Sequence, residues 1–513
     1  MEYLKQTKWK FYIVWGIIFA AGILFRVAFL TKYPMGTNGD EAYAGYEAFA
    51  LLHTGVDSHG YHNPVYFISW GSGMNVLYSW LSIPFIRMGG LSLLTIRLPQ
   101  ALMGCVSLVV FYFLLKEIKD AGFALFGMFL LAINPWHIMM CRWGLESNLA
   151  PALILLGVYF LVKAYKGKMS HYIPAFLCFG LVLYAYAVMW VFVPLFLLLA
   201  AIYGFYQKKV QINRYLLIGI LILGILAVPL LLFLAVNRGY LPEIQTAFFS
   251  IPRMDSMRAG EISLHGIPGK IKDLLYFLVT QVDRDSFNTS NVGIYYFCSI
   301  PFIAIGIAES VGSFVGNWKR KCFQAADLLS LWFVAAFFVG CVISYVNVNK
   351  INCIHFPMIY FAANGCMLVI RKLRSWLLYP IVAIYLVFLC FFCGWYYNEQ
   401  KIDFYYGYED ALEYAKEVTD GEIGVVMIRY SNLFLYTQML PQEYLPEVNG
   451  CKNYDEIRQF GRYLMNPSAE EMQPDTVYVV PKMVQDMYLQ DGFSVIFDNY
   501  CYVVLKCGEE KIP

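Results

Sequence analysis

The segment FYIVWGIIFAAGILFRVAFL, from Phe11 to Leu30, decides the class of this protein. Its apolar run is long enough to cross a bilayer, because about 20 helical residues span roughly 30 Å of hydrocarbon. A cleavable signal sequence has a shorter apolar core and a small-residue cleavage site. This segment instead contains Arg26, and no such site follows it. We therefore expect an uncleaved membrane-spanning helix.

The rest of the chain continues this apolar pattern. Hydrophobic residues make up 59% of the 513 and charged residues only 14%, whereas soluble proteins are about a quarter charged. The thirteen cysteines are scattered, so they imply no disulfide framework. The pattern predicts eleven spans, at residues 11–30, 97–116, 121–138, 149–165, 171–187, 190–206, 214–236, 293–312, 325–346, 351–370 and 376–397.

Basic residues predict the orientation of these spans. Lys and Arg gather in alternate loops, at residues 116–119, 163–168, 208–214, 319–321 and 371–374, on the same side as the N-terminus. By the positive-inside rule that side is the cytoplasm. The assignment requires residues 74–91, which contain Pro84 and Arg87, to lie in the outer interface rather than to cross. The long loops 31–96 and 237–292 then face outward.

The C-terminal tail differs in composition and predicts a separate domain. Residues 409–418 and 454–465 have the spacing of amphipathic helices, and residues 422–428, 476–480 and 493–505 that of strands, the last folded at Asp498-Asn499. We expect a transmembrane domain at residues 1–397 and a small extracytoplasmic α/β domain at residues 398–513. The predicted fold class is therefore an α-helical polytopic membrane protein with about eleven spans, interfacial helices in its first outer loop and this C-terminal domain.

Candidate catalytic residues follow the first span directly. Asp40 and Glu41 lie in an outer loop that also carries three histidines, His53, His59 and His62. Carboxylates and imidazoles at one face of a chain with few charges are typical of chemistry or ion binding. The alternative is that Asp40 and Glu41 serve a helix N-terminus, with Asp40 as its N-cap. The histidine spacing does not match a metal site, so a divalent metal is an alternative that we do not predict, and no cofactor is expected.

Other outer loops carry further candidates for substrate binding. Arg142 and Glu146 are four residues apart, which also suits a salt bridge at a helix end. Arg253, Arg258 and Lys270 lie in loop 237–292 and suit a substrate phosphate or, alternatively, lipid headgroups. A carboxylate facing basic residues at a membrane surface suits transfer of a sugar from a lipid-phosphate donor.

The order of these features resembles a known family. A first span, the Asp40-Glu41 pair, His62-Asn63-Pro64, an interfacial helix and Arg97-Leu98-Pro99 opening the second span are similar to the membrane-embedded glycosyltransferases of superfamily C. Within that superfamily the pattern resembles the protein-mannosyltransferase-like and aminoarabinose-transferase-like branch. The resemblance covers about the first 240 residues, and the remaining spans and tail agree in layout.

The resemblance implies roles for individual residues. Asp40 matches the catalytic base and Glu41 the second acid of the pair. His62 lies in the segment expected to contact the donor, although the family has His-Pro-Pro or Lys-Pro-Pro there. Arg142 and Glu146 match an Arg and an acid after the third span, where the family more often has Asp.

The expected function follows from these roles. We expect an inverting integral-membrane glycosyltransferase that moves a sugar from a polyprenyl-phosphate donor to a protein, lipid or glycan acceptor on the outer face. Its partners are then the donor, the acceptor and membrane lipid, with no nucleic acid, and no nucleotide-binding P-loop occurs in the sequence. The predicted location is a bacterial plasma membrane with a cytoplasmic N-terminus, although an endoplasmic-reticulum protein would have the same topology. The main alternative is a transporter or flippase for a lipid-linked or polysaccharide precursor, which predicts charges in the middle of the spans.

Overall fold

The computed structural model describes residues 2–256, 262–283, 290–399, 405–489 and 492–507. The chain divides into two compact units. Unit 1 contains residues 1–30, 97–232 and 258–399, and unit 2 contains residues 31–96, 233–257 and 400–513. Residues 31–96 and 233–257 therefore group with the C-terminal tail.

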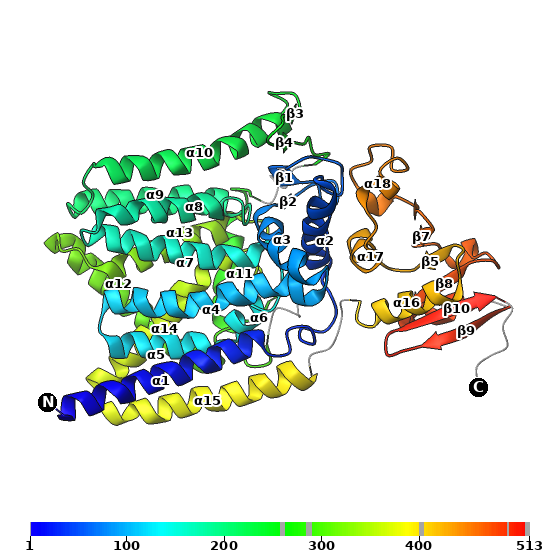
Figure 1. The fold of residues 1–513 in the computed structure, drawn as a ribbon. Helices are drawn as coiled ribbons and strands as arrows, with labels where there is room; N and C mark the ends of the chain where they lie inside the picture. The colour runs from blue at the N-terminus through cyan, green and yellow to red at the C-terminus, as the bar shows by residue number, and fades with distance from the viewer. Residues whose placement is uncertain (1, 257–261, 284–289, 400–404, 490–491, 508–513) are drawn as a thin grey trace. The chain divides into compact units, whose positions relative to one another are not determined.

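Unit 1 consists of helices that run side by side (Figure 1). Across the described residues, nine helices of the chain are long and apolar enough to cross a membrane, and two apolar helices, Ala121–Ala132 and Met169–Val182, are shorter. These two coincide with the predicted spans 121–138 and 171–187. The protein is thus a helical polytopic membrane protein with about nine candidate spans. Its main helices are α1 Glu2–Val27, α4 Leu93–Ile118, α5 Ala121–Ala132, α6 Pro135–Met140, α7 Glu146–Tyr165, α8 Tyr172–Val182, α9 Met189–Tyr206, α10 Arg214–Asn237, α11 Ile267–Thr280, α12 Ile300–Arg320, α13 Ala325–Val342, α14 His355–Lys372 and α15 Leu378–Gly394.

Small residues allow two of these helices to pack very closely. A Cβ atom added to Gly306 of α12 would lie 1.9 Å from the carbonyl oxygen of Phe361 in α14. A Cβ atom added to Gly365 of α14 would lie 1.9 Å from the carbonyl oxygen of Phe302. Helices inside membranes associate through such small-residue contacts, because lipid offers no hydrophobic driving force between them.

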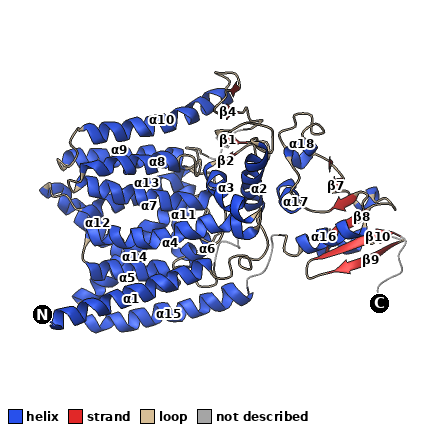
Figure 2. Ribbon diagram, viewed as in Figure 1, coloured by secondary structure: helices blue, strands red, loops and turns tan. Residues whose placement is uncertain are grey.

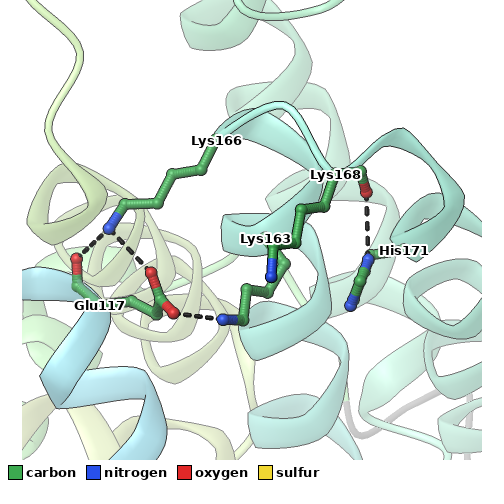
Figure 3. A network of polar contacts seen from close by, with 5 residues as sticks. All are labelled: Glu117, Lys163, Lys166, Lys168 and His171. Atoms are coloured by element: carbon green, nitrogen blue, oxygen red, sulfur yellow. Dashed lines mark hydrogen bonds and ion pairs between the residues drawn. The ribbon is translucent and has the colours of Figure 1, made fainter.

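One of the basic clusters used to predict orientation forms a charged network at helix ends (Figure 3). Glu117 near the end of α4 pairs with Lys163 near the end of α7 and, at 2.9 Å, with Lys166. His171 Nδ1 lies 3.1 Å from the carbonyl oxygen of Lys168. These charged groups occupy the loops that the sequence assigns to the cytoplasmic side.

The loop part of unit 2 contains two helices and short hairpins. Helix α2 runs from Gly39 to Thr54 and α3 from Leu77 to Gly89, and α3 is not among the candidate spans found in the described residues. Strands β1 Tyr66–Phe67 and β2 Met74–Asn75 pair with each other, as do β3 Ile244–Gln245 and β4 Ser250–Ile251.

The tail of unit 2 forms a mixed six-stranded sheet, of which β8, β9 and β10 are seen in Figure 2. The strand order is β6-β7-β5-β8-β10-β9, and β5 is parallel to both β7 and β8. Val426, Tyr478, Val480, Val503 and Leu505 form a buried apolar cluster on this sheet. The elements are α16 Tyr408–Val418, β5 Ile423–Val425, α17 Tyr430–Thr437, α18 Pro441–Tyr444, β6 Gln459–Phe460, β7 Tyr463–Met465, β8 Val477–Pro481, α19 Gln485–Tyr488, β9 Phe493–Asp498 and β10 Tyr502–Cys507.

The predicted helix at residues 454–465 is wrong. The structure has a short 3-10 turn at Tyr454–Glu456 followed by strands β6 and β7. Gly461 between the strands has φ +54°, which suits a tight turn and interrupts a helix. Tyr463 and Met465 are buried on either side of a half-buried residue, so the period is two rather than 3.6. The predicted helix at 409–418, the strands within 422–428 and 476–480, and the hairpin within 493–505 are confirmed.

Candidate functional site

The predicted catalytic acids lie in the first turn of α2, in unit 2. Asn38 is the N-cap of this helix, and its side-chain oxygen accepts a hydrogen bond of 2.8 Å from the Asp40 backbone N–H. Asp40 is half-buried and Glu41 fully buried. The positive end of the helix dipole stabilises carboxylates at this position.

The alternative prediction that Asp40 is the N-cap is wrong. The helix begins at Gly39, so the cap falls two residues before Asp40 and an amide rather than a carboxylate fills it. Asn is as good an N-cap as Asp because either side-chain oxygen accepts from the first free N–H groups. Helix initiation therefore does not require the Asp40 carboxylate.

The residues before α2 are held by α17 of the C-terminal tail. Asn432 Nδ2 donates to the Thr37 carbonyl oxygen at 3.0 Å, and the Tyr436 hydroxyl donates to Thr37 Oγ1 at 3.0 Å. A Cβ atom on Gly39 would lie 3.2 Å from Cδ of Arg429, closer than most real contacts. Glycine thus lets the start of α2 approach the start of α17. Asp40 is positioned by elements nearly 400 residues apart in the chain.

Two further carboxyl groups are buried, Glu47 on α2 and Asp57 in the loop that follows it. Glu47 accepts hydrogen bonds from the backbone N–H of Ser58 at 2.9 Å and from its hydroxyl. Asp57 Oδ1 accepts from the backbone N–H groups of His59 at 3.0 Å and Tyr61 at 2.8 Å. Burial raises the pKa of Glu47 to about 7 and raises that of Asp57, whose pKa the neighbouring Glu47 charge raises further.

Two tyrosines of the C-terminal tail contact the loop next to this acidic pair. The hydroxyls of Tyr444 and Tyr454 both donate to the Ser58 carbonyl oxygen, at 3.0 and 2.9 Å. The ring of His59 stacks on Tyr454 with centroids 4.2 Å apart. Burial lowers the pKa of His59 to about 3, so its imidazole is neutral at physiological pH. The network fixes the loop to the tail and thereby holds α2 in place.

His62 lies at the surface of unit 2, away from this buried network. Its Nδ1 is 2.8 Å from the Gly55 carbonyl oxygen, and its Nε2 is 3.0 Å from Asn63 Nδ2. Pro64, which follows, forms a bridge with Ser250 of β4. Contact of His62 with a donor stays a prediction. Among the residues that the structure describes, no three His, Cys, Asp or Glu side chains are grouped as a metal site.

Arg142 and Glu146 lie in unit 1. Glu146 is the first residue of α7 and is 5% exposed. The fully buried Arg142 guanidinium donates to the carbonyl oxygens of Phe25 and Phe29, both at 2.9 Å, and lies 5.8 Å from the ring of Tyr396. It therefore satisfies carbonyl groups at the C-terminal end of α1, which have no partners within the helix. Its contact with substrate stays a prediction.

The basic candidates of loop 237–292 are divided between the units. Arg253 in unit 2 is exposed, and its Nη2 donates to the Leu241 carbonyl oxygen at 2.9 Å. Lys270 in unit 1 donates to the carbonyl oxygens of Ser263 at 2.6 Å and Val342 at 3.2 Å. Arg258 lies outside the described residues.

Sequence reasoning missed a buried amide network in unit 1. Trp136 Nε1 donates to Asn352 Oδ1 at 3.2 Å, and Asn352 Nδ2 donates to Asn148 Oδ1 at 3.2 Å. Asn148 and Asn352 are 204 residues apart, so no local pattern connects them. Arg429 was also not among the predicted site residues. It directly follows a predicted strand, and ligands often bind at the ends of strands, so its position could have indicated it as a candidate.

The fold matches solved structures of membrane proteins. ArnT from Cupriavidus metallidurans in the apo state matches with a TM-score of 0.59 at 14% identity, over 96% of this chain and 97% of that one. The same protein bound to undecaprenyl phosphate matches with a TM-score of 0.59 at 13% identity, over 97% and 98%. This chain has the ArnT fold.

A second match extends the comparison. The Archaeoglobus fulgidus oligosaccharyltransferase in complex with Zn and sulfate matches with a TM-score of 0.53 at 14% identity, over 83% of this chain and 62% of that one. No protein-family model matches the sequence, and no curated protein matches it. The predicted resemblance is confirmed for the fold, because the structure of ArnT matches over nearly the full length of this chain.

Proposed function

We propose that this protein transfers a sugar from a polyprenyl-phosphate donor to an acceptor at the outer face of a membrane. The observation that carries the proposal is the match, over 97% of this chain, to ArnT bound to undecaprenyl phosphate. The carboxyl groups of Asp40 and Glu41 at the start of α2, in the loop that follows the first span along the chain, supply the acids that such a transfer uses.

Asp40 acts as the general base in this proposal. An acceptor hydroxyl attacks the anomeric carbon while its proton passes to the Asp40 carboxylate. The bond from that carbon to the phosphate oxygen breaks on the opposite side, the polyprenyl phosphate leaves with the electron pair, and the anomeric configuration inverts. Glu41 is the second acid of the pair. The N-cap role of Asn38 supports the assignment, because helix capping does not explain the Asp40 carboxylate.

Substrate contacts are proposed for the remaining predicted residues. A phosphate contact is proposed for Arg253, whose guanidinium is exposed, because planar guanidinium groups bind phosphate well. The same role is proposed for Arg258 and for Lys270, and a donor contact for His62, Arg142 and Glu146, each residue considered by itself. The acceptor is a protein, lipid or glycan.

The proposed topology has eleven spans, with the helices Ala121–Ala132 and Met169–Val182 crossing the membrane despite their length. The N-terminus is cytoplasmic. Residues 1–397 form the transmembrane glycosyltransferase domain and residues 398–513 the extracytoplasmic domain. The location is a bacterial plasma membrane.

Binding of the lipid carrier tests the donor class. Purified full-length protein in detergent is mixed with undecaprenyl phosphate or with undecaprenol, and complexes are measured by native mass spectrometry. The proposal predicts at least tenfold tighter binding of the phosphorylated lipid, since the phosphate is recognised. Equal binding of both lipids, or none, contradicts it.

A further inference from the structure

The C-terminal tail carries an open pocket of about 530 Å³ that the proposed chemistry does not use. It lies where β5 and β7 end: residues 426–429 follow β5, and Asn466 and Ser468 follow β7. Asp455, Tyr405 and Tyr488 also line its wall.

The topology of the sheet favours binding at this edge. Strand β5 lies between β7 and β8 and is parallel to both, so the carboxyl ends of three strands meet at one edge. The chain passes from β5 to β7 on one side and then returns to β8 on the other. Sheets of this kind bind ligands in the crevice outside the carboxyl ends, at the strand where the order reverses.

The pocket wall is held in an unusual backbone conformation. Tyr405, Met427 and Asn466 all have φ in the left-handed region, at 56°, 54° and 48°. Such residues cost about 1–3 kcal/mol each and concentrate at functional sites. Asn466 fixes the loop after β5, because its Oδ1 accepts from the Ile428 N–H at 3.0 Å and its Nδ2 donates to the Ile428 carbonyl oxygen at 3.1 Å.

The chemistry of the wall suits a neutral ligand rich in hydroxyl groups. Arg429 and Asp455 contribute one positive and one negative charge, so the two charges balance. The amide of Asn466 and the hydroxyl of Ser468 add both donors and acceptors, and the tyrosine rings offer faces for an apolar sugar face. An anion or a lipid tail would instead favour an excess of positive charge or an apolar wall.

Arg429 also connects the pocket to the catalytic helix. Its side chain lines the pocket, and its Cδ lies 3.2 Å from the Cβ position of Gly39, the residue before Asp40. Ser431 Oγ and Asn432 Oδ1 both lie 3.6 Å from that same point. These two buried oxygens have no hydrogen-bond partner among the residues that the structure describes. Buried polar atoms without partners are rare in native proteins and call for an explanation.

We propose that this pocket is the acceptor subsite and takes a neutral glycan, bound at the side chain of Arg429 that contacts Gly39, the residue before Asp40. The inference rests on the proposed function and assigns the C-terminal tail the task of choosing the acceptor. Transfer then joins a donor sugar to an existing glycan rather than to a peptide or a lipid phosphate.

Direct binding tests this assignment without requiring the donor. Purified full-length protein is titrated with neutral di- to tetrasaccharides built from glucose, mannose, galactose or arabinose, and separately with inorganic phosphate, by isothermal calorimetry. We expect at least one neutral oligosaccharide to bind, and at least tenfold weaker binding in Asp455→Asn and in Arg429→Gln. Arg458→Gln and Asp475→Asn, exposed residues outside the pocket wall, are the matched controls and bind as wild type.

The other outcomes would overturn either the acceptor assignment or the proposed function. If no neutral oligosaccharide binds the wild type, or if both pocket variants bind as tightly as the controls, the acceptor assignment is overturned. Binding of phosphate instead identifies an anion site and also overturns it. Binding of undecaprenyl phosphate tests the proposed function separately. If only acceptor recognition is lost, the pocket variants still bind this lipid. Asp455→Asn does not alter the Arg429 contact with the Trp70 ring at 5.0 Å, so it stays informative if Arg429→Gln unfolds.

Discussion

At the scale of single residues, Asn38 and Asp40 have separate tasks at the start of α2. Replacing Asn38 by Ala removes the oxygen that accepts from the Asp40 N–H, and such caps contribute about 1 kcal/mol. We therefore expect Asn38→Ala to lower the thermal unfolding temperature of the purified protein. Asp40→Asn, the matched change at the proposed catalytic position, keeps the cap and removes only the charge that the helix dipole favours, so we expect it to lower the unfolding temperature less. The reverse ranking of the two variants would mean that Asp40 itself stabilises the helix.

Glu47 makes the stability of unit 2 depend on pH. Its folded-state pKa of about 7 is raised from 4.5, so its contribution to folding is fully present below about pH 4.5 and is lost as pH rises through about 7. Asp57, whose pKa is also raised, acts in the same direction. His59 acts in the opposite direction, because its lowered pKa removes stability as pH falls from 6.5 towards about 3.

The variant Glu47→Gln removes the Glu47 contribution together with the effect of the Glu47 charge on the pKa of Asp57. Glutamine resembles the protonated acid, with its Nε2 able to donate to Ser58 Oγ and its oxygen able to accept from the Ser58 N–H. We expect the unfolding temperature of the variant, relative to wild type, to rise between pH 4.5 and pH 7.5. A difference that is constant over this range would show that Glu47 does not titrate there. The comparison of variant with wild type cancels the contribution of His59.

Short-range signals explain which residues could be placed from sequence. Asp40 and Glu41 were placed at a helix start because the polar residues before an apolar run are adjacent in the chain. The Arg142 contacts with α1 could not be predicted, since they join residues 117 and 113 positions apart. The sequence shows only a basic residue near a membrane surface. It does not distinguish a residue that binds a ligand phosphate from one that binds the carbonyl groups of a helix.

At the scale of elements, the contact of α12 with α14 depends on two glycines. Gly306→Ala places a methyl group against the Phe361 carbonyl oxygen, and the two backbones must separate to admit it. We expect a loss of about 1–3 kcal/mol or more, seen as a lower unfolding temperature and lower yield of folded protein. Gly312→Ala in the same helix is the control, because no atom lies within 4 Å of its Cβ position. That change gains up to about 1 kcal/mol from helix propensity. Similar behaviour of the two variants would contradict the close packing.

The tail shows how far local patterns define elements. Runs of β-branched and aromatic residues predicted several strands correctly, namely those near 423–425 and 477–481 and the hairpin β9–β10. Residues 454–465 were misread because charged residues at helical spacing outweighed the turn at Gly461. The segment forms a strand because β7 pairs with β5. This pairing joins residues about 40 positions apart, which no local sequence window includes.

At the scale of the whole molecule, the grouping of chain segments was beyond sequence reasoning. Residues 31–96 and 233–257 join the C-terminal tail in one unit, through contacts such as Tyr444 with Ser58. Apolar periodicity indicates spans but carries no information on which outer loops meet. Eleven spans were predicted, whereas nine helices of the described residues are long and apolar enough to cross, because two of the predicted spans correspond to shorter helices.

Reporter insertions test the proposed topology across one of those shorter helices. Gly167 precedes Met169–Val182, and Gly239 follows α10. Three helices cross between these points if the shorter helix spans the membrane, and two cross if it does not. We expect alkaline phosphatase to be inactive after Gly167 and active after Gly239. The same activity at both sites would mean that Met169–Val182 does not cross.

The central claim is that Asp40 is the base of a polyprenyl-phosphate sugar transferase. The most direct test compares wild-type, null and Asp40→Asn strains, with lipid-linked sugars and surface glycans profiled together by mass spectrometry at matched protein levels. We expect the Asp40→Asn strain to match the null strain, losing one glycan and accumulating one polyprenyl-phosphate sugar. A point variant that matches wild type while the null shows the defect would contradict it.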